Sequence, residues 1–349
     1  MSRDRWFPDP AKTHKVWSKW AHCTVIRCLD AWYSEERMSE VMKPRVWLDM
    51  DPGIDDAWAL VVAMNQSIVT GISTVAGNAG LQNTYANAKR VLEVVGGRRV
   101  PVVPGASEPL LTPLATAPGF HGQGGMGEWN VSTEIIPPEM TRVWTWWSQH
   151  AGEMNSTHLI ATGPLTNIAI SLLAYPHLST IWASVTCMCG ALPGAQMDKA
   201  QEFNVYTDPH AADIVFHWAQ RVQLIGINVA HKAVIPMSDL DRLNRMGEVG
   251  HMLEKMLKFY SQRARGEGGD PRAFPIDDVV AVAAVVRPEI FEWREMPLAV
   301  VREGPLRGTV VLSPIDVRRS PVRVATDVDV AGFRDWLWEA MDCYEEESW

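Results

Sequence analysis

The sequence predicts an α/β fold in which an open, mostly parallel, Rossmann-like sheet is flanked by helices. Short apolar runs of strand length alternate with longer segments of helical periodicity, which is the pattern of βαβ units. Polar or acidic residues follow several of these runs directly, as expected where parallel strands end at a ligand site. The chain of 349 residues is also long enough to bury one large core of this kind.

The individual elements follow from this alternation in chain order. Apolar runs predict strands at residues 46–50, 68–75, 100–103, 158–161, 181–188 and 223–227. Helical patterns predict helices at residues 55–65, 81–95, 165–174 and 209–219. Toward the C-terminus, residues 298–324 predict a hairpin or an extension of the sheet edge, and residues 330–342 predict a final helix.

The first residues of the chain differ from the rest. Residues 1–43 are rich in tryptophan, proline and charged side chains, and they precede the first clear strand. We interpret them as an appended N-terminal extension. Residues 44–349 carry the alternating pattern without an internal repeat, so the sequence predicts one domain there.

Composition and charge narrow the classes of partner. Hydrophobic residues make up 47% of the chain and charged residues 21%, which is ordinary for a globular protein. The formal net charge of −9 argues against nucleic acid or an anionic membrane as the main partner. No run reaches the roughly 20 apolar residues of a membrane span, and the first residues lack the apolar core of a signal peptide. The 5 scattered cysteines favour reduced thiols and a cytoplasmic location.

Residues 46–58, VWLDMDPGIDDAW, gather four aspartates around a Pro-Gly turn. Carboxylates so close together repel one another unless a cation lies between them, and Ca²⁺ prefers oxygen ligands of this kind. Asp51 and Asp56 flank the turn, which can fold both side chains toward one point. Asp55 or Asp56 could instead cap the following helix, but capping explains one aspartate and not four. A second acidic pair, at residues 277–278, also opens an apolar helix and could complete an oxygen cage.

Several blocks in a fixed order give the chain a family resemblance. From about Arg45 to the C-terminus the sequence resembles the nucleoside hydrolases, the inosine-uridine preferring nucleoside N-ribohydrolases. The blocks that carry this resemblance are LDMDPGIDDAWAL (48–60), TVAGN (74–78), NAKRVLEVVG (87–96), FHGQGGMG (120–127), ATGPLTNIA (161–169), EFNVYTDPHAA (202–212) and PIDDVVAVA (275–283). The resemblance implies the nucleoside hydrolase fold and the hydrolysis of the N-glycosidic bond of a ribonucleoside to free base and ribose.

The resemblance also implies a metal site and a catalytic base. Asp51, Asp56, Asp278 and the backbone carbonyl of Thr162 would bind Ca²⁺, and Asp51 would take the proton from the metal-bound water. Coordination lowers the pKa of a water by several units, and carboxylates stabilise the positive charge that develops on the ribose. No organic cofactor is implied. The candidate catalytic residues are Asp51, Asn78 and Asp277.

The candidate substrate-binding residues come from the same blocks. By resemblance, the ribose hydroxyls would be held by Asp55, Asn78, Glu202, Asn204 and Asp278. Met188 matches a position that packs under the sugar, and His121 lies in a glycine-rich loop near the nucleobase. Glu202 and Asn204 alternate around Phe203, so in an extended segment they would point the same way. For His231, in NVAHKAVI, we expect a structural role.

Two positions depart from the family pattern. Members that prefer inosine and uridine usually carry histidine where this chain has Asp277, and that histidine is understood to protonate the departing base. A carboxyl group with an ordinary pKa near 3.9 replaces an imidazole near 6.5, so we do not expect Asp277 to copy that role. Either Asp277 accepts hydrogen bonds from a purine or atypical base, or aromatic stacking activates the leaving group. Gln196 replaces an asparagine that contacts the ribose 5′-hydroxyl.

Two other functions fit parts of the sequence. A haloacid-dehalogenase-like phosphohydrolase also begins with a strand that ends in Asp-x-Asp, but the DPGIDDA and EFN blocks have no role there. A non-catalytic nucleoside or sugar binder would explain the changes at Asp277 and Gln196, but not the retained Asp51, Asp56 and Asp278. The expected partner is a small-molecule nucleoside, with no nucleic acid and no membrane. A homodimer or homotetramer is implied by the resemblance alone.

Overall fold

A computed structural model describes residues 43–129, 132–191, 201–267, 273–313 and 319–345. Apart from Lys43, the N-terminal extension predicted for residues 1–43 lies outside these residues. The candidate substrate residue Gln196 lies outside them as well. Within the described part of the chain, no helix is long and apolar enough to cross a membrane.

An eight-stranded sheet forms the centre of the described residues from Pro44 onward, with the strand order β3-β2-β1-β4-β5-β6-β12-β9. Neighbouring strands of this sheet run parallel, except that β9 runs antiparallel to β12. The predicted mostly parallel α/β fold is therefore confirmed. The strands are β1 (Arg45–Met50), β2 (Ile68–Thr74), β3 (Val102–Pro104), β4 (Thr157–Ala161), β5 (Ser184–Met188), β6 (Val222–Ile225), β9 (Phe291–Met296) and β12 (Val322–Val328).

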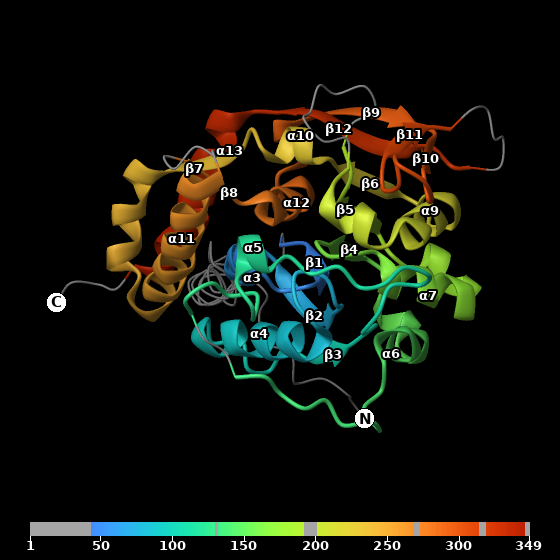
Figure 1. Cartoon of the computed structure of the whole chain (residues 1–349), viewed down its shortest axis with the longest axis horizontal. Helices are drawn as coiled ribbons and strands as arrows, with labels where there is room; N and C mark the ends of the chain where they lie inside the picture. The colour runs from blue at the N-terminus through green and yellow to red at the C-terminus, as the bar shows by residue number, and fades with distance from the viewer. Residues whose placement is uncertain (1–42, 130–131, 192–200, 268–272, 314–318, 346–349) are drawn as a thin grey trace, which may run out of the picture. The chain divides into compact units, whose positions relative to one another are not determined.

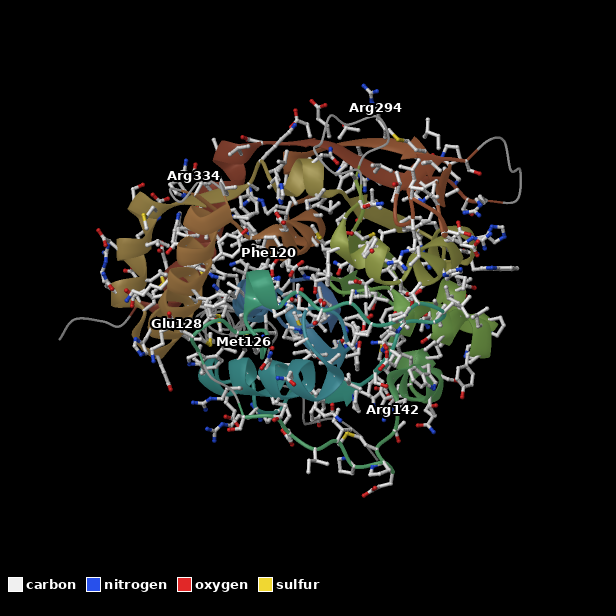
Figure 2. The ribbon with its side chains drawn as sticks, in the orientation of Figure 1. Phe120, Met126, Glu128, Arg142, Arg294 and Arg334 are labelled. Atoms are coloured by element: carbon white, nitrogen blue, oxygen red, sulfur yellow. The ribbon has the colours of Figure 1, made fainter. Side chains whose placement is uncertain are left out.

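Helices cover both faces of the sheet (Figure 1). One face packs against α3 (Ile54–Gln66), α4 (Leu81–Val94), α11 (Gly247–Glu267), α12 (Asp277–Val286) and α13 (Val330–Met341). The other face packs against α6 (Val143–Gln149), α7 (Thr166–Ala174) and α9 (Pro209–Trp218). Side chains fill the space between these layers (Figure 2).

Shorter elements complete the described chain. The short helices are α5 (Pro118–His121), α8 (Phe203–Thr207) and α10 (Ile227–Ala230). Two small ribbons pair β7 (Val234–Pro236) with β8 (Ala273–Pro275), and β10 (Leu298–Val300) with β11 (Val310–Leu312). The 3₁₀ helices are η1 (Ala151–Glu153), η2 (Pro176–Thr180), η3 (Met237–Arg245), η4 (Pro288–Ile290) and η5 (Asp342–Tyr344).

Alternation along β1 divides its side chains between the two layers. Val46, Leu48 and Met50 belong to the apolar cluster on the α3 side, whereas Trp47 belongs to the cluster on the α7 side. All four side chains are fully buried. Burying a large apolar side chain contributes about 1.5–3 kcal/mol relative to exposure, so both faces hold β1 in register. Asp51 is thereby fixed directly beyond the strand.

The predicted elements differ from the observed ones mainly where pairing between distant strands sets the bounds of an element or the sheet that it joins. The strand predicted at 181–188 begins only at Ser184, because the preceding residues follow η2. Residues 298–324 separate into the β10–β11 ribbon and the start of β12, which enters the main sheet. Neither α11 nor β9 was predicted. The β9 sequence FEWREM is largely exposed at the sheet edge, so it lacks the apolar run that marks the inner strands.

The strand order reverses beside β1. The chain proceeds from β1 outward to β2 and β3, and later returns to place β4, β5 and β6 on the other side of β1. In open α/β sheets, ligands bind beyond the carboxyl ends of the strands at such a switch point. Asp51 follows β1 and Thr162 follows β4, its neighbour, so the topology brings these two residues to the same place.

Candidate active site

Asp51 is fully buried at the end of β1, where its carboxyl group packs closely against the backbone of two glycines. Its Oδ2 accepts a hydrogen bond of 2.6 Å from the backbone N–H of Asn78. A Cβ on Gly77 would lie 2.0 Å from this oxygen, and a Cβ on Gly163 would lie 2.7 Å from Oδ1. Glycine at these positions is therefore what admits the carboxyl group. Oδ1 is buried without a hydrogen-bond partner in the described part of the chain, so it is available to a ligand.

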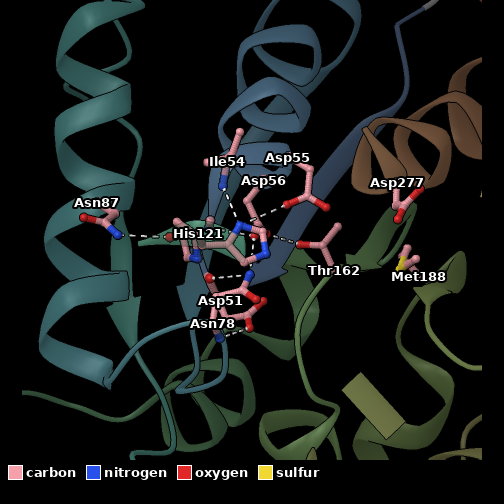
Figure 3. A network of polar contacts seen from close by, with 12 residues as sticks. Asp51, Ile54, Asp55, Asp56, Asn78, Asn87, His121, Thr162, Met188 and Asp277 are labelled. Atoms are coloured by element: carbon pink, nitrogen blue, oxygen red, sulfur yellow. Dashed lines mark hydrogen bonds and ion pairs between the residues drawn. The ribbon is translucent and has the colours of Figure 1, made fainter. Parts of the chain in front are cut away.

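Asp56 ties the Pro-Gly turn to the ends of β2 and β4. Its Oδ2 accepts a hydrogen bond of 2.8 Å from the N–H of Gly53, which closes the first turn of α3. The side-chain amide of Asn78 lies 3.3 Å from the same oxygen. Oδ1 of Asp56 accepts a hydrogen bond of 2.7 Å from the hydroxyl of Thr162. Asp56 therefore caps a helix and also belongs to the polar site, as Figure 3 shows.

Carboxylates from two distant segments converge at the starts of α3 and α12. One oxygen from each of Asp55, Asp56 and Asp278 lies within 4.8 Å of the others, a spacing that can hold a metal ion. Asp278 is supplied by α12, which packs against α3. The structure thus brings together the aspartates that the sequence placed far apart. It also adds Asp55, which was predicted to hold ribose, to the possible cation ligands.

Burial and mutual repulsion raise the pKa of each carboxyl group in this cluster. Burial raises the pKa of Asp55 to about 7, with the charge of Asp277 adding to the effect. For Asp56 the pKa rises to about 6, mainly through burial and then through repulsion by Asp55. Burial comes first again for Asp51 and Asp278, whose pKa values lie well above the ordinary range. A site that is costly to ionise without a counterion is suited to a divalent cation.

Asn204 connects the ends of β4 and β5 through its side-chain amide. Its Nδ2 donates to the carbonyl of Thr162 at 2.7 Å and to the carbonyl of Met188 at 3.0 Å. Thr162 thus reaches the site with both oxygens, its hydroxyl bonded to Asp56 and its carbonyl bonded to Asn204. Met188, at the end of β5, is 4% exposed, so it combines a position in the core with one beside the site.

The segment around Phe203 is helical and not extended, so the alternation of Glu202 and Asn204 does not apply. Glu202 is the N-cap of α8, and Asn204 lies in the first turn of that helix. The carboxylate of Glu202 accepts hydrogen bonds from the N–H groups of Gly190, Asn204 and Val205 at 2.7, 2.7 and 3.1 Å. Capping satisfies amides that a short helix leaves free, which outweighs the local alternation. Glu202 therefore fixes Asn204 through the backbone.

His121 anchors the glycine-rich loop to the Pro-Gly turn. The Nδ1 atom of His121 accepts a hydrogen bond of 3.1 Å from the N–H of Ile54. A Cβ on Gly53 would lie 2.6 Å from this nitrogen, so the turn needs glycine there. Burial lowers the pKa of His121 to about 4, against the opposing charges of Asp56 and Asp277. The ring is therefore neutral at pH 7 and is not a solvated loop histidine. Phe120, next to it on α5, is exposed (Figure 2).

Asn87 is a positioning residue that the sequence reasoning missed. Its side-chain amide donates to the carbonyls of Pro52, at 3.0 Å, and Gly124, at 2.7 Å. It thereby joins the acidic turn to the loop that carries His121 (Figure 3). A signal was present, because Asn87 opens the block NAKRVLEVVG. A polar residue on the buried side of α4 needs partners, and these carbonyls are the partners.

Asp49 does not belong to the acidic cluster, although the sequence groups it there. Oδ1 of Asp49 accepts hydrogen bonds from Ser73 at 2.5 Å and from the side-chain amide of Asn167 at 2.7 Å. Trp47 donates to the same serine from the α7 side of the sheet. Because residues two apart in a strand face the same side, Asp49 lies with Trp47 in a buried network under the site. Of the four aspartates in residues 46–58, only Asp51, Asp55 and Asp56 belong to the site, and Asp278 joins them from α12.

The fold and this site define an α/β protein whose clustered carboxylates can hold a divalent cation at the carboxyl ends of the parallel strands. The chain belongs to the inosine-uridine preferring nucleoside hydrolase family, whose model matches residues 46–335. It is accordingly a ribonucleoside hydrolase, an enzyme that cleaves N-glycosidic bonds. This membership sets aside the phosphohydrolase and the non-catalytic binder.

Curated relatives and solved structures agree with this assignment. The pyrimidine-specific ribonucleoside hydrolase RihA of Salmonella typhimurium LT2 is 31% identical over 306 residues, covering 85% of this chain and 98% of that protein. A plant nucleoside hydrolase, PpNRh1, shares 28% identity with a TM-score of 0.78, covering 85% of this chain and 98% of the other. The purine-preferring ribonucleoside hydrolase from Gardnerella vaginalis has the same fold, with 23% identity, a TM-score of 0.79 and coverages of 86% and 98%.

Proposed function

We propose that this enzyme hydrolyses ribonucleosides with a bound Ca²⁺ ion, and that Asp51 accepts a proton from the attacking water. The observation that carries this proposal is the convergence of carboxylates from α3 and α12, on which the charge of Asp51 acts from the end of β1. Asp55, Asp56 and Asp278 approach within 4.8 Å of one another, and Asp51 keeps one buried oxygen free among the described residues. Uncompensated charges at such a place are costly, so a cation is needed to hold them ionised.

The residues present fit Ca²⁺ in chemistry. Calcium takes six to eight oxygen ligands in flexible geometry, and this site offers only oxygen donors. Asp51, Asp56, Asp278 and the carbonyl of Thr162 would hold the ion, and Asp55 is a further carboxylate within reach. When bound, the ion lowers the pKa of a water molecule and fixes its position.

The protein's own side chains have separate tasks in the reaction. Asp51, held by the N–H of Asn78, takes the proton of the water that attacks C1′. Asp55, Asn78, Glu202, Asn204 and Asp278 hold the ribose and surround it with negative potential. A positive charge develops on the sugar ring as the N-glycosidic bond breaks, so anionic neighbours lower the barrier.

The choice of nucleobase depends on Asp277. Oδ1 of Asp277 is buried without a hydrogen-bond partner in the described part of the chain, so it can accept a hydrogen bond from a base that carries an amino group. This supports a nucleoside whose base carries an amino group, such as an aminopurine or an atypical base, over uridine. The relatives point in both directions, since one is named pyrimidine-specific and another purine-preferring. A homodimer or homotetramer and a cytoplasmic location stay predictions.

A substrate and metal screen tests this function. The protein is stripped with a chelator, then assayed for free ribose with purine, pyrimidine and modified nucleosides, with and without Ca²⁺. We expect little turnover after stripping, recovery with Ca²⁺, and higher kcat/KM for bases with an exocyclic amino group. Activity that survives full removal of metal would contradict the role of the cation.

The variant Asp277→His tests base choice separately. If Asp277 selects the base, this variant gains hydrolysis of uridine and loses hydrolysis of the amino-bearing substrates. Unchanged selectivity would show that residue 277 does not control the base. The matched control is Asp327→His, because Asp327 is an exposed carboxylate paired with Lys232 at 2.7 Å, and we expect it to leave selectivity unchanged.

A further inference from the structure

Asp277 and His231 form a pair at the edge of the acidic site. The Nε2 atom of His231 lies 3.2 Å from Oδ2 of Asp277, and 48% of the histidine side chain is exposed compared with 13% of the aspartate. His231 is the C-cap of α10, whereas Asp277 begins α12. The two residues therefore come from different segments, and Asp277 is the less exposed member of the pair.

A buried ribbon holds this pair in place. Strands β7 and β8 pair antiparallel, with Val234 opposite Pro275 and Ile235 opposite Phe274. His231 comes just before β7 and Asp277 just after β8, so the ladder brings them together from opposite directions. Ile235 and Phe274 are each 1% exposed, which anchors the ribbon in the core. The β7–β8 pairing therefore holds His231 and Asp277 near each other through the backbone.

The charged groups around His231 are mostly acidic. Asp277 faces it directly, and Asp55 and Glu202 act on it from α3 and from the start of α8. Its neighbour Lys232 is bound to Asp327 of β12 at 2.7 Å. Asp55 and Glu202 are also residues proposed to hold the ribose, so His231 lies within electrostatic range of the sugar site.

We propose that His231, positioned by Asp277, is the acid that protonates the departing nucleobase in this enzyme. The proposal rests on the proposed function, since it assigns the leaving-group step of the same reaction. By the family resemblance, Asp277 stands where histidine is usual, and the structure places His231, the C-cap of α10, beside it. The histidine that is missing at residue 277 is thus replaced by His231, which lies beside residue 277 in the fold.

The proton balance of this step is complete. The C1′–N bond breaks, its electron pair passes to the base, and the proton on Nδ1 of His231 transfers to a base nitrogen. Nε2–H remains bonded to Asp277, which fixes the ring. The water oxygen bonds to C1′ while Asp51 takes one of its protons. Because His231 is half exposed, solvent returns a proton to Nδ1 after the base leaves.

The protonation state of His231 suits this role. The hydrogen bond with Asp277 raises the pKa of His231, burial opposes the rise, and the charges of Asp277, Asp55 and Glu202 add to it. His121, the other histidine at the site, is neutral because burial lowers its pKa to about 4. His231 is therefore the better proton donor of the two at pH 7.

Two substrates that differ only in their leaving group test the proposal. A nucleoside base needs a proton to depart, whereas the nitrophenolate of 4-nitrophenyl β-D-ribofuranoside leaves without one. For His231→Gln with Ca²⁺ present, we expect kcat on the best nucleoside to fall by about 10²–10⁴-fold. We expect kcat on the aryl riboside to stay within a few-fold of wild type.

Controls separate an acid from a structural residue. Equal losses on both substrates, or no loss on the nucleoside, would overturn the proposal. His177→Gln, an exposed histidine on η2, should leave both activities unchanged, and thermal unfolding checks that each variant folds. A wild-type enzyme inactive on both substrates would instead contradict the proposed function itself.

The pH profile gives a second readout. For wild type, kcat on the nucleoside should fall on the alkaline side as His231 loses its proton. His231→Gln should lack this limb, and Asp277→Asn should shift it to lower pH, because the negative charge that stabilises the imidazolium is gone. An unshifted limb in Asp277→Asn would contradict the positioning role of Asp277.

Discussion

The carboxyl group of Asp51 is held in place by the absence of two side chains. Gly77 and Gly163 leave the space that its oxygens fill, and the amide after Gly77 donates the hydrogen bond to Oδ2. A catalytic base must be held close to its productive position, since a displacement of about 1 Å can reduce turnover about 10²-fold. The glycines of the TVAGN and ATGPL blocks therefore act through Asp51.

The first prediction concerns Gly77→Ala. The new Cβ would lie 2.0 Å from Oδ2 of Asp51, so the carboxylate must move and kcat should fall by about 10²-fold or more. Steady-state assays with the best nucleoside and Ca²⁺ measure this. The matched control is Gly80→Ala, three residues later, where a Cβ meets nothing within 4 Å. Equal activity of the two variants would contradict the steric role.

At the scale of single elements, short helices and turns beyond the strand ends place the polar side chains. Helix α8 has only five residues, so its capping by Glu202 matters more than its helical propensity. Helix α3 is closed by Asp56 and Gly53, and the loop with His121 is tied to the same turn. Each of these contacts provides a hydrogen-bond acceptor for a backbone N–H group and also orients a residue of the site.

The second prediction concerns Glu202→Ala. Loss of the N-cap should lower the free energy of unfolding by about 0.5–2 kcal/mol. It should also raise KM, because the ribose loses a proposed contact with Glu202 and Asn204 loses its support. Denaturant unfolding and steady-state kinetics measure the two effects. Asp329→Ala is the control, since Asp329 caps α13 in the same way, accepting from the N–H groups of Ala331 and Gly332. It should lower stability similarly with KM unchanged; a rise in KM there would count against a local role of Glu202.

At the scale of the whole molecule, the fold gathers four segments at one switch point. Asp51 follows β1, Asn78 follows β2, Thr162 follows β4, and Asp278 comes from α12. Parallel neighbours end at the same edge of the sheet, which explains the first three. The packing of α12 against α3 explains the fourth.

The third prediction concerns pH and stability. The pKa values of Asp55 and Asp56 are raised to about 7 and about 6, so the folded metal-free state binds protons more tightly than the unfolded chain does. Stability from this source is fully present below about pH 4 and is lost as the pH rises through 6 to 7. The melting temperature of chelated protein should therefore fall from pH 5 to pH 8.

Ca²⁺ should reverse this loss. At 100 times its Kd, a ligand that binds only the folded state stabilises it by about 2.7 kcal/mol. We expect the gain in melting temperature to be larger at pH 8 than at pH 5, because protons compete for the same oxygens at pH 5. Calorimetry with and without Ca²⁺ checks this, and Asp278→Asn should show a smaller gain. A gain independent of pH would argue that the ion binds elsewhere.

The sequence alone determined the alternation of strands and helices, the acidic turn after β1 and the acidic start of α12. These features depend on local periodicity and on residues close together in the chain. The tertiary structure decided which side chains meet. It placed Asp49 under the sheet with Asn167, made Glu202 a helix cap and paired His231 with Asp277 through the β7–β8 ribbon. Such contacts depend on strand pairing and helix packing between distant segments, and local pattern does not specify that pairing.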